Sequence, residues 1–216
     1  MRYDAVIFDL DGTLLNTLDD LAESTNYALE QCGFPRRTVD EARRFVGNGV
    51  GLLIHRAVPA DTPEEAEAAC LKVFQAHYLT HMREKTAPYP GILELLEALN
   101  RAGCGVAVVS NKFDAAVKNL CRDYFGRAVP VAIGESATVR RKPAPDTVFA
   151  ALAELEASAA RAVYVGDSDV DIDTARNAGM DCLSVSWGFR DREFLLAHGA
   201  SRIVDSPAEL LRALEG

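Results

Sequence analysis

From Tyr89 onward, the chain alternates between short apolar runs and longer stretches whose apolar residues recur at helical spacing. Such alternation predicts strands that are separated by helices. Strands joined by helical crossovers run parallel, and a parallel sheet needs helices on both of its faces. We therefore predict an α/β fold with a doubly wound, Rossmann-like parallel sheet. The predicted strands are residues 5–8, 105–109, 129–133, 162–165, 182–185 and 203–204, and the predicted helices are 92–100, 114–124, 145–155, 170–178, 192–198 and 207–214.

A long helical segment interrupts this pattern after the first strand. Apolar residues recur at helical spacing from Leu18 until Gly33 and Pro35 end the run, and no convincing strand follows before residue 84;. Further helices are predicted over residues 39–46, 50–58 and 63–81, the last opened by a capping Thr62 and by acidic residues in its first turn;. We therefore expect an α/β core formed by residues 1–15 and 86–216, with residues 16–85 inserted as an α-helical domain.

Composition narrows the class of protein. The chain has 216 residues, and its 49% hydrophobic content is enough for a substantial core;. Its net charge of -9 argues against nucleic acid or an anionic membrane as a partner, because both attract clustered positive charge;. Without an apolar stretch long enough to span a bilayer or a basic leader in front of one, we expect cytoplasmic residence and no membrane partner. A monomer and a homodimer are both compatible with the sequence.

Two aspartates, Asp9 and Asp11, follow the first predicted strand directly. Side chains two residues apart in extended chain point the same way, and two carboxylates that close repel each other. A cation between them, protonation of one, or hydrogen bonds would relieve that repulsion. A site that combines a nucleophile, an acid/base and a metal ion meets these conditions, whereas an acidic turn or a helix cap is the plainer alternative.

Three more polar clusters follow later strands, where a parallel sheet collects its ligands. Ser110-Asn111-Lys112 offers a hydroxyl and backbone N–H groups to phosphate oxygens, although a simple turn has the same composition;. Lys142 lies in a basic loop and could neutralise both a phosphoryl group and a carboxylate. Asp167 and Asp171 come off the fourth predicted strand; Asp171 could instead cap a helix, while Asp167 is suited to Mg²⁺;.

The order of these clusters, Asp-x-Asp-Gly-Thr, Ser-Asn, Lys-Pro and Gly-Asp-x-x-x-Asp, resembles all four motifs of the haloacid dehalogenase-like phosphohydrolases. The resemblance covers nearly the whole chain. It implies an enzyme in which Asp9 is the nucleophile that forms an aspartyl-phosphate and Asp11 is the general acid and then the base. It also implies a Mg²⁺ site made by Asp9, the Asp11 backbone carbonyl and Asp167, with Asp171 behind them, and phosphate binding by Gly12, Thr13, Ser110, Asn111 and Lys142.

The helical insert resembles the small cap of this family, whose members with such a cap tend to act on small phosphorylated metabolites. Within it, Gly47-Asn48-Gly49 opens a predicted helix and could bring backbone donors close to an anion, or form a plain interhelical turn;. Together with Lys112, this motif resembles bacterial phosphoglycolate phosphatases, so we expect hydrolysis of 2-phosphoglycolate to glycolate and phosphate. The substrate carboxylate could be received by Lys112 or by an arginine of the insert, namely Arg43, Arg44 or Arg56.

Asn16 departs from the pattern, because relatives commonly carry an acidic residue there; we expect substrate choice rather than the chemistry at phosphorus to be sensitive to it. Other readings stay open. A phosphosugar phosphatase, a phosphosugar mutase or a pyrophosphatase could use the same fold, and a non-catalytic phosphometabolite-binding protein is the alternative from a different class.

Overall fold

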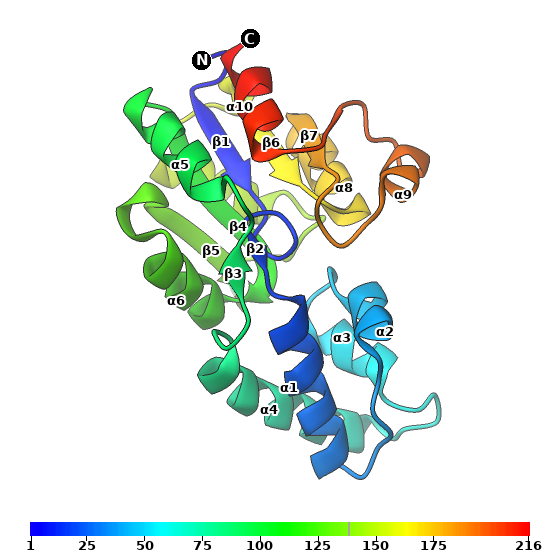
Figure 1. Ribbon diagram of the computed structural model, residues 1–216. Helices are drawn as coiled ribbons and strands as arrows, with labels where there is room; N and C mark the ends of the chain where they lie inside the picture. Colours follow the sequence, from blue (N-terminus) through cyan, green and yellow to red (C-terminus); the bar gives the residue numbers. More distant parts are fainter. Residues whose placement is uncertain (138) are drawn as a thin grey trace. The chain divides into compact units, whose positions relative to one another are not determined.

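The computed structural model describes residues 1–137 and 139–216 (Figure 1). The chain forms two compact units. One comprises Met1–Leu15 and Pro88–Gly216, and the other comprises Asn16–Ala87. Both changes of unit fall in short paired strands, β2 (Leu15–Asn16) and β3 (Ala87–Pro88).

The larger unit is built on a parallel sheet, as predicted. Within the described residues, six strands are arranged in the order β5-β4-β1-β6-β7-β8. The first strand, β1, lies between β4 and β6, with Ala5 opposite both Gly105 and Ala162. The strands are β1 (Ala5–Phe8), β4 (Gly105–Phe113), β5 (Val131–Glu135), β6 (Ala162–Gly166), β7 (Asp181–Val185) and β8 (Ile203–Val204).

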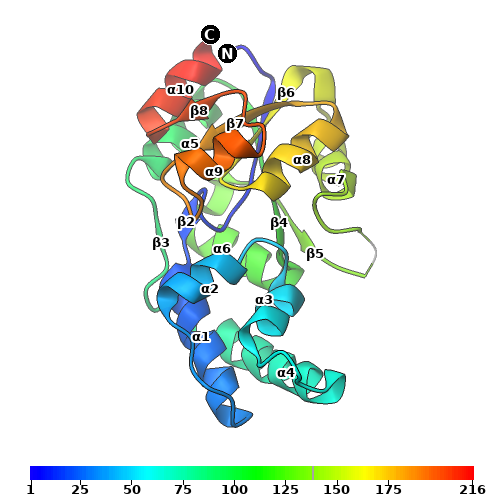
Figure 2. The same ribbon diagram turned by 90° about the vertical axis from the view of Figure 1, so that its right-hand side faces the viewer.

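Helices cover both faces of this sheet, which explains why β1 is buried at every position (Figure 2). Ala5 and Ile7 pack against α7 and α8 in one apolar cluster, while Val6 and Phe8 are equally buried on the opposite face. A strand covered on both faces reads as continuous apolar sequence rather than as alternation. The helices of this unit are α5 (Ile92–Arg101), α6 (Asp114–Tyr124), α7 (Asp146–Glu154), α8 (Asp169–Ala178), α9 (Arg192–Ala197) and α10 (Pro207–Glu215).

The smaller unit is helical, as the spacing of its apolar residues predicts. Its helices are α1 (Leu18–Gln31), α2 (Val39–Phe45), α3 (Val50–Ala57) and α4 (Glu64–His81). Thr38 and Glu41 form a reciprocal capping box at the start of α2;. The buried carboxylate of Asp20 on α1 accepts the backbone N–H groups of Lys85 and Thr86, both at 2.9 Å, so it fixes the returning chain to α1.

Four strands differ from their predicted bounds, β6 and β7 by a single residue each and β4 and β5 by more. β4 continues through Ser110-Asn111-Lys112 to Phe113, where the sequence predicted an end at residue 109, because paired backbone continues past the apolar run. β5 occupies Val131–Glu135 rather than residues 129–133; a short 3₁₀ turn at Gly126–Ala128 and two further residues precede it. A second 3₁₀ turn, Ala159–Arg161, precedes β6. In the described part of the chain, no helix is long and apolar enough to cross a membrane.

Candidate active site

The predicted polar clusters converge at the carboxyl ends of three neighbouring strands. Asp9 follows β1 directly, and its backbone N–H group donates to the carbonyl of Val165 on β6 at 2.9 Å. Asp167 comes directly after β6. Because β1 lies between β4 and β6, residues that are about 100 to 160 positions apart in sequence meet at one edge;.

Lys142 joins the first and last of these clusters. Its ammonium donates hydrogen bonds to Asp9 Oδ1 at 2.9 Å, to Asp171 Oδ1 at 2.8 Å and to the Tyr164 hydroxyl at 2.9 Å. Its side chain is 2% exposed, so these acceptors replace water around the charge;. The Asn111 amide donates to the Lys142 backbone carbonyl at 3.0 Å and connects this loop to β4. The basic loop therefore delivers a buried cation rather than a solvated one.

Asp171 caps α8 and holds Lys142 at the same time. Its Oδ2 accepts from the backbone N–H and the hydroxyl of Ser168, which completes a capping box with that residue. Its Oδ1 accepts from Lys142 and from the Tyr164 hydroxyl. Gly166 makes room for this arrangement, because a Cβ there would lie 2.3 Å from Asp171 Cγ. The capping alternative and the functional prediction thus apply to the same side chain.

Asp167 is clamped between two glycines. A Cβ at Gly12, whose φ is +86°, would lie 2.3 Å from Asp167 Oδ2, and a Cβ at Gly188 would lie 2.3 Å from Asp167 Cβ. The backbone N–H of Phe189 donates to Asp167 Oδ2 at 2.6 Å. The Thr13 hydroxyl donates to Asp167 Oδ1 at 3.4 Å. Substitution of either glycine would therefore displace this carboxylate.

Asp11 has a cation of its own. Lys112, from the end of β4, places its ammonium 3.1 Å from Asp11 Oδ1. The Lys112 side chain is 2% exposed and that of Asp11 is 12% exposed, so Asp11 keeps some contact with water. The Ser110 hydroxyl accepts the Lys112 backbone N–H at 3.2 Å.

Negative charge is in excess around Lys142. Burial, reinforced by neighbouring carboxylates, raises the pKa of Asp9 well above its usual range, although Lys142 opposes that shift. Burial and the Asp171 carboxylate raise the pKa of Asp167 to about 7. Burial disfavours the charged form of Lys142, but Asp171 and Asp9 more than offset this, and its pKa is raised. The raised pKa values of the two aspartates and of Lys142 follow from burial and from three carboxylates that surround one ammonium. A bound cation would relieve this excess of negative charge.

The donor set suits a hard divalent cation. One carboxylate oxygen from each of Asp9, Asp167 and Asp171 lies within 4.8 Å of the other two, and all three residues are buried. Each Asp171 oxygen accepts two hydrogen bonds, from Lys142 and Tyr164 on Oδ1 and from Ser168 on Oδ2. Each Asp167 oxygen accepts one, from Thr13 or Phe189, so Asp9 and Asp167 are the better placed ligands. Oxygen donors without nitrogen or sulfur fit Mg²⁺ or Ca²⁺ rather than zinc.

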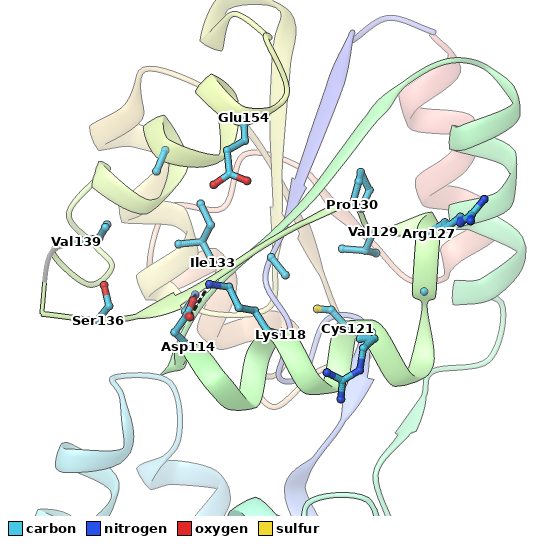
Figure 3. A pocket seen from close by; sticks show the side chains of 15 residues that line it. Asp114, Lys118, Cys121, Arg127, Val129, Pro130, Ile133, Ser136, Val139 and Glu154 are labelled. Atoms are coloured by element: carbon cyan, nitrogen blue, oxygen red, sulfur yellow. Dashed lines mark hydrogen bonds and ion pairs between the residues drawn. The ribbon is translucent and has the colours of Figure 1, made fainter.

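Other polar features lie apart from this cluster. A groove of about 880 Å³ runs along the edge strand β5 and is lined by Asp114, Lys118, Cys121 and Ile133 among others, but by none of the clustered aspartates (Figure 3). Gly47, Asn48 and Gly49 belong to the helical unit, where Gly47 and Gly49 adopt φ angles of +119° and +88° just before α3. Glycine is favoured at both positions.

Known proteins resemble this chain over nearly its full length. A family model described as haloacid dehalogenase-like hydrolase matches residues 6–185. The chain belongs to the haloacid dehalogenase-like hydrolase family. It is 35% identical over 223 residues to a phosphoglycolate phosphatase of Mesorhizobium japonicum, with 96% of each chain covered. These findings confirm the predicted family and fold, and they support an enzyme of the phosphatase class.

Two solved structures share the fold. A protein from Lactobacillus delbrueckii subsp. bulgaricus, assigned as a phosphoglycolate phosphatase, is 39% identical with a TM-score of 0.94, and the match covers 99% of each chain. A mutant of CbbY from Rhodobacter sphaeroides, in complex with xylulose 1,5-bisphosphate, is 31% identical with a TM-score of 0.79 and 96% of each chain covered. The fold of this haloacid dehalogenase-like hydrolase therefore occurs with more than one named small phosphorylated compound.

Several site residues of this family member were missed from the sequence. Tyr164 lies inside an apolar strand and looked like core, yet its hydroxyl bonds to Lys142 and Asp171. After β7, the Trp187 indole N–H donates to the Thr13 carbonyl at 3.0 Å, next to Gly188 and its contact with Asp167. The signal that could have found this segment is its position: Ser186–Arg190 follows a strand end in the same sheet and contains a glycine beside aromatic residues.

Proposed function

We propose that this protein is a Mg²⁺-dependent phosphomonoester hydrolase that works through an aspartyl-phosphate on Asp9. The observation that carries the proposal is the buried set of Asp9, Lys142 and Asp167 beside the separate pair Asp11–Lys112. It offers a nucleophile, an acid/base and countercharge within one strand edge. Membership of a hydrolase family supports the same reading.

In the first step, an Asp9 carboxylate oxygen attacks phosphorus in line with the leaving oxygen. The new bond joins Asp9 to phosphorus while the bond to the substrate oxygen breaks, and Asp11 gives that oxygen its proton. Asp9, the Asp11 backbone carbonyl and Asp167 would hold Mg²⁺, which when bound supplies positive charge to the phosphate oxygens. Lys142 keeps the Asp9 carboxylate oriented through its contact at 2.9 Å;.

In the second step, water attacks phosphorus from the side that the alcohol has left. Asp11, now a carboxylate, takes a proton from that water, and the bond from Asp9 to phosphorus breaks to release inorganic phosphate. The backbone N–H groups of Gly12 and Thr13, the Ser110 hydroxyl and the Asn111 segment would hold the phosphoryl oxygens in both steps. Asp11 therefore works in two opposite protonation states during one turnover.

We assign 2-phosphoglycolate as the substrate on the strength of the relatives named phosphoglycolate phosphatase. A sugar bisphosphate is the second candidate, because the CbbY structure is named with xylulose 1,5-bisphosphate. The helical unit, Asn16–Ala87, would act as the cap, with Gly47, Asn48 and Gly49 contributing to substrate choice. Cytoplasmic residence and a monomeric or homodimeric state stay predictions of the sequence.

Phosphate release from a panel of small phosphate esters, with and without Mg²⁺, tests this proposal. We expect turnover of 2-phosphoglycolate that Asp9→Asn abolishes, while Asp173→Asn, the same change at an ion pair near the surface of α8, leaves it intact. Xylulose 1,5-bisphosphate, a hexose phosphate and pyrophosphate belong in the same panel. A preference for one of those three compounds would overturn the assignment of 2-phosphoglycolate as the substrate. Near-normal activity of Asp9→Asn would overturn the assignment of Asp9 as the nucleophile. A stable phosphorylated product without phosphate release would indicate a mutase.

A further inference from the structure

Two lysines in the described part of the chain have buried side chains, and each contacts a different aspartate of the Asp-x-Asp pair. Lys142 contacts Asp9, and the proposed mechanism uses it. Lys112 contacts Asp11 at 3.1 Å and has no step in that mechanism. From the sequence alone, Lys112 was a candidate receiver of the substrate carboxylate. Its contact with the acid/base suggests a different task.

The backbone of β4 is irregular at the point where it presents Lys112. Val109 pairs with Ile133 and Phe113 pairs with Glu135, so four residue steps on β4 are matched by two on β5. The extra residues form a bulge, a feature that redirects side chains and is frequent beside active sites. Gly134 on β5 accommodates it, because a Cβ there would lie 2.7 Å from the Lys112 carbonyl and 2.4 Å from Asp114 Cα. Both strands therefore contribute to the irregular backbone that presents Lys112.

Stability alone does not account for the pair. Replacing a buried ion pair with apolar side chains of similar size is often neutral or stabilising, since removing two charges from water costs as much as their attraction returns. A buried lysine that is placed on the acid/base by a bulge is therefore better explained by what it does to Asp11.

We propose that Lys112 is a positioning residue that holds the Asp11 carboxyl group in the orientation from which it delivers a proton to the leaving oxygen. The inference rests on the proposed function, because it takes Asp11 to be the general acid. Loss of this contact removes one restraint on the side-chain torsions of Asp11, and its proton then meets the leaving oxygen less often. Lys112 itself touches neither substrate nor reacting atoms in this role.

The test compares leaving groups. The kcat/KM of Lys112→Met is measured with 2-phosphoglycolate, with 2-hydroxyethyl phosphate, which is also an alkyl ester but lacks the carboxylate, and with p-nitrophenyl phosphate, whose leaving group needs little protonation. General acid catalysis contributes roughly 10²- to 10⁴-fold, so misplacing the acid should lower kcat/KM for both alkyl esters by about 10- to 100-fold. For the aryl ester we expect a loss of no more than about threefold under the same reasoning.

Lys118→Met is the matched control, because Lys118 also pairs with an aspartate, Asp114 at 2.7 Å, but on the exposed surface of α6. It should leave all three values unchanged. A loss confined to 2-phosphoglycolate would mean that Lys112 binds the substrate carboxylate, and an equal loss for all three esters would mean a structural role. Either result, or no loss at all, overturns the inference while leaving the proposed function standing.

A double-mutant cycle tests the route through Asp11 directly. In an Asp11→Asn background, Lys112→Met should cause no further loss with either alkyl ester, because the group that it positions is gone. A further loss of about tenfold or more there would overturn the inference. If Lys112→Met alone folds poorly, comparing Asp11→Asn with Asp11→Asn/Lys112→Met still provides the test, since the double variant removes both charges of the pair. Lys112→Arg, which keeps a cation, should recover part of the rate with the alkyl esters. If wild-type protein hydrolyses none of the esters, the proposed function fails and the inference fails with it.

Discussion

Replacing Gly188 with alanine should weaken metal binding without touching any ligand. Gly188 lies on the segment that follows β7, and a Cβ there would lie 2.3 Å from Asp167 Cβ, 2.4 Å from Asp167 Oδ2 and 2.5 Å from the Gly12 carbonyl oxygen. Asp167 cannot move toward Gly12, because Gly12 itself approaches the same carboxylate. The Asp167 carboxylate or its backbone, or the segment around Gly188, must therefore shift to accommodate the new methyl group.

The size of the effect follows from these distances. Ordinary contact of a Cβ begins at 3.4 Å, so Asp167 or the segment around Gly188 must move by about 1 Å. A misplacement of about 1 Å in an active site can cost on the order of 10²-fold in rate. Loss of the groups that orient a metal ligand typically costs about 10- to 100-fold in affinity. Overpacking of this kind also destabilises a fold by about 1–3 kcal/mol.

Two measurements on Gly188→Ala check this reasoning. Direct binding of Mn²⁺, followed by its electron paramagnetic resonance signal, reports metal affinity without turnover, and phosphate release against Mg²⁺ concentration reports the effect on activity. Gly51→Ala is the control, because Gly51 lies in α3 with nothing within 4 Å of a built Cβ. We expect the control to bind metal like wild type. Unchanged metal affinity and rate in Gly188→Ala would refute the argument that these glycines position Asp167.

Two further predictions follow from hydrogen bonds of single side chains, and a third follows from the acidic cluster. Tyr164→Phe removes a hydroxyl bonded to Lys142 and Asp171, so it should lower stability by about 1–2 kcal/mol in urea unfolding and reduce kcat;. Asp20→Ala leaves two backbone N–H groups without their carboxylate and should cost about 3 kcal/mol in the same assay, whereas Asp19→Ala at an exposed position of α1 should cost little;. A chelator should abolish phosphate release, and added Mg²⁺ should restore it; activity that persists in chelator would contradict the metal site.

Strand ends made most of the candidate site predictable. The apolar runs before Asp9 and Asp167 located two strands, and the parallel arrangement required both carboxylates to reach the same edge;. Lys142 was predictable in kind, as a cation near the nucleophile, but its contact with Tyr164 was not. Apolar spacing identifies a buried strand, yet it cannot separate a tyrosine that fills the core from one whose hydroxyl completes a polar network.

Lys112 shows a second limit of the sequence. The apolar run ends at Val109, so the sequence predicts the end of the strand there, whereas the strand continues through a bulge to Phe113. A bulge changes where side chains point without changing the composition of the strand. The role of Gly188 could not be predicted from the sequence either, because Gly188 and Asp167 come close together only in the folded chain.

The lysine contacts also answer the problem that two neighbouring carboxylates pose. Asp9 and Asp11 are only two positions apart, yet each faces a different ammonium, Lys142 for Asp9 and Lys112 for Asp11. Lys112 comes from the end of β4 and Lys142 from the segment between β5 and α7, so the two carboxylates lie in separate electrostatic environments. Lys142 is shared between Asp9 and Asp171, whereas Lys112 contacts Asp11, and the Asp9 and Asp11 side chains are each 12% exposed. Such a division suits one carboxylate that stays in place as nucleophile and another that exchanges protons with substrate and solvent.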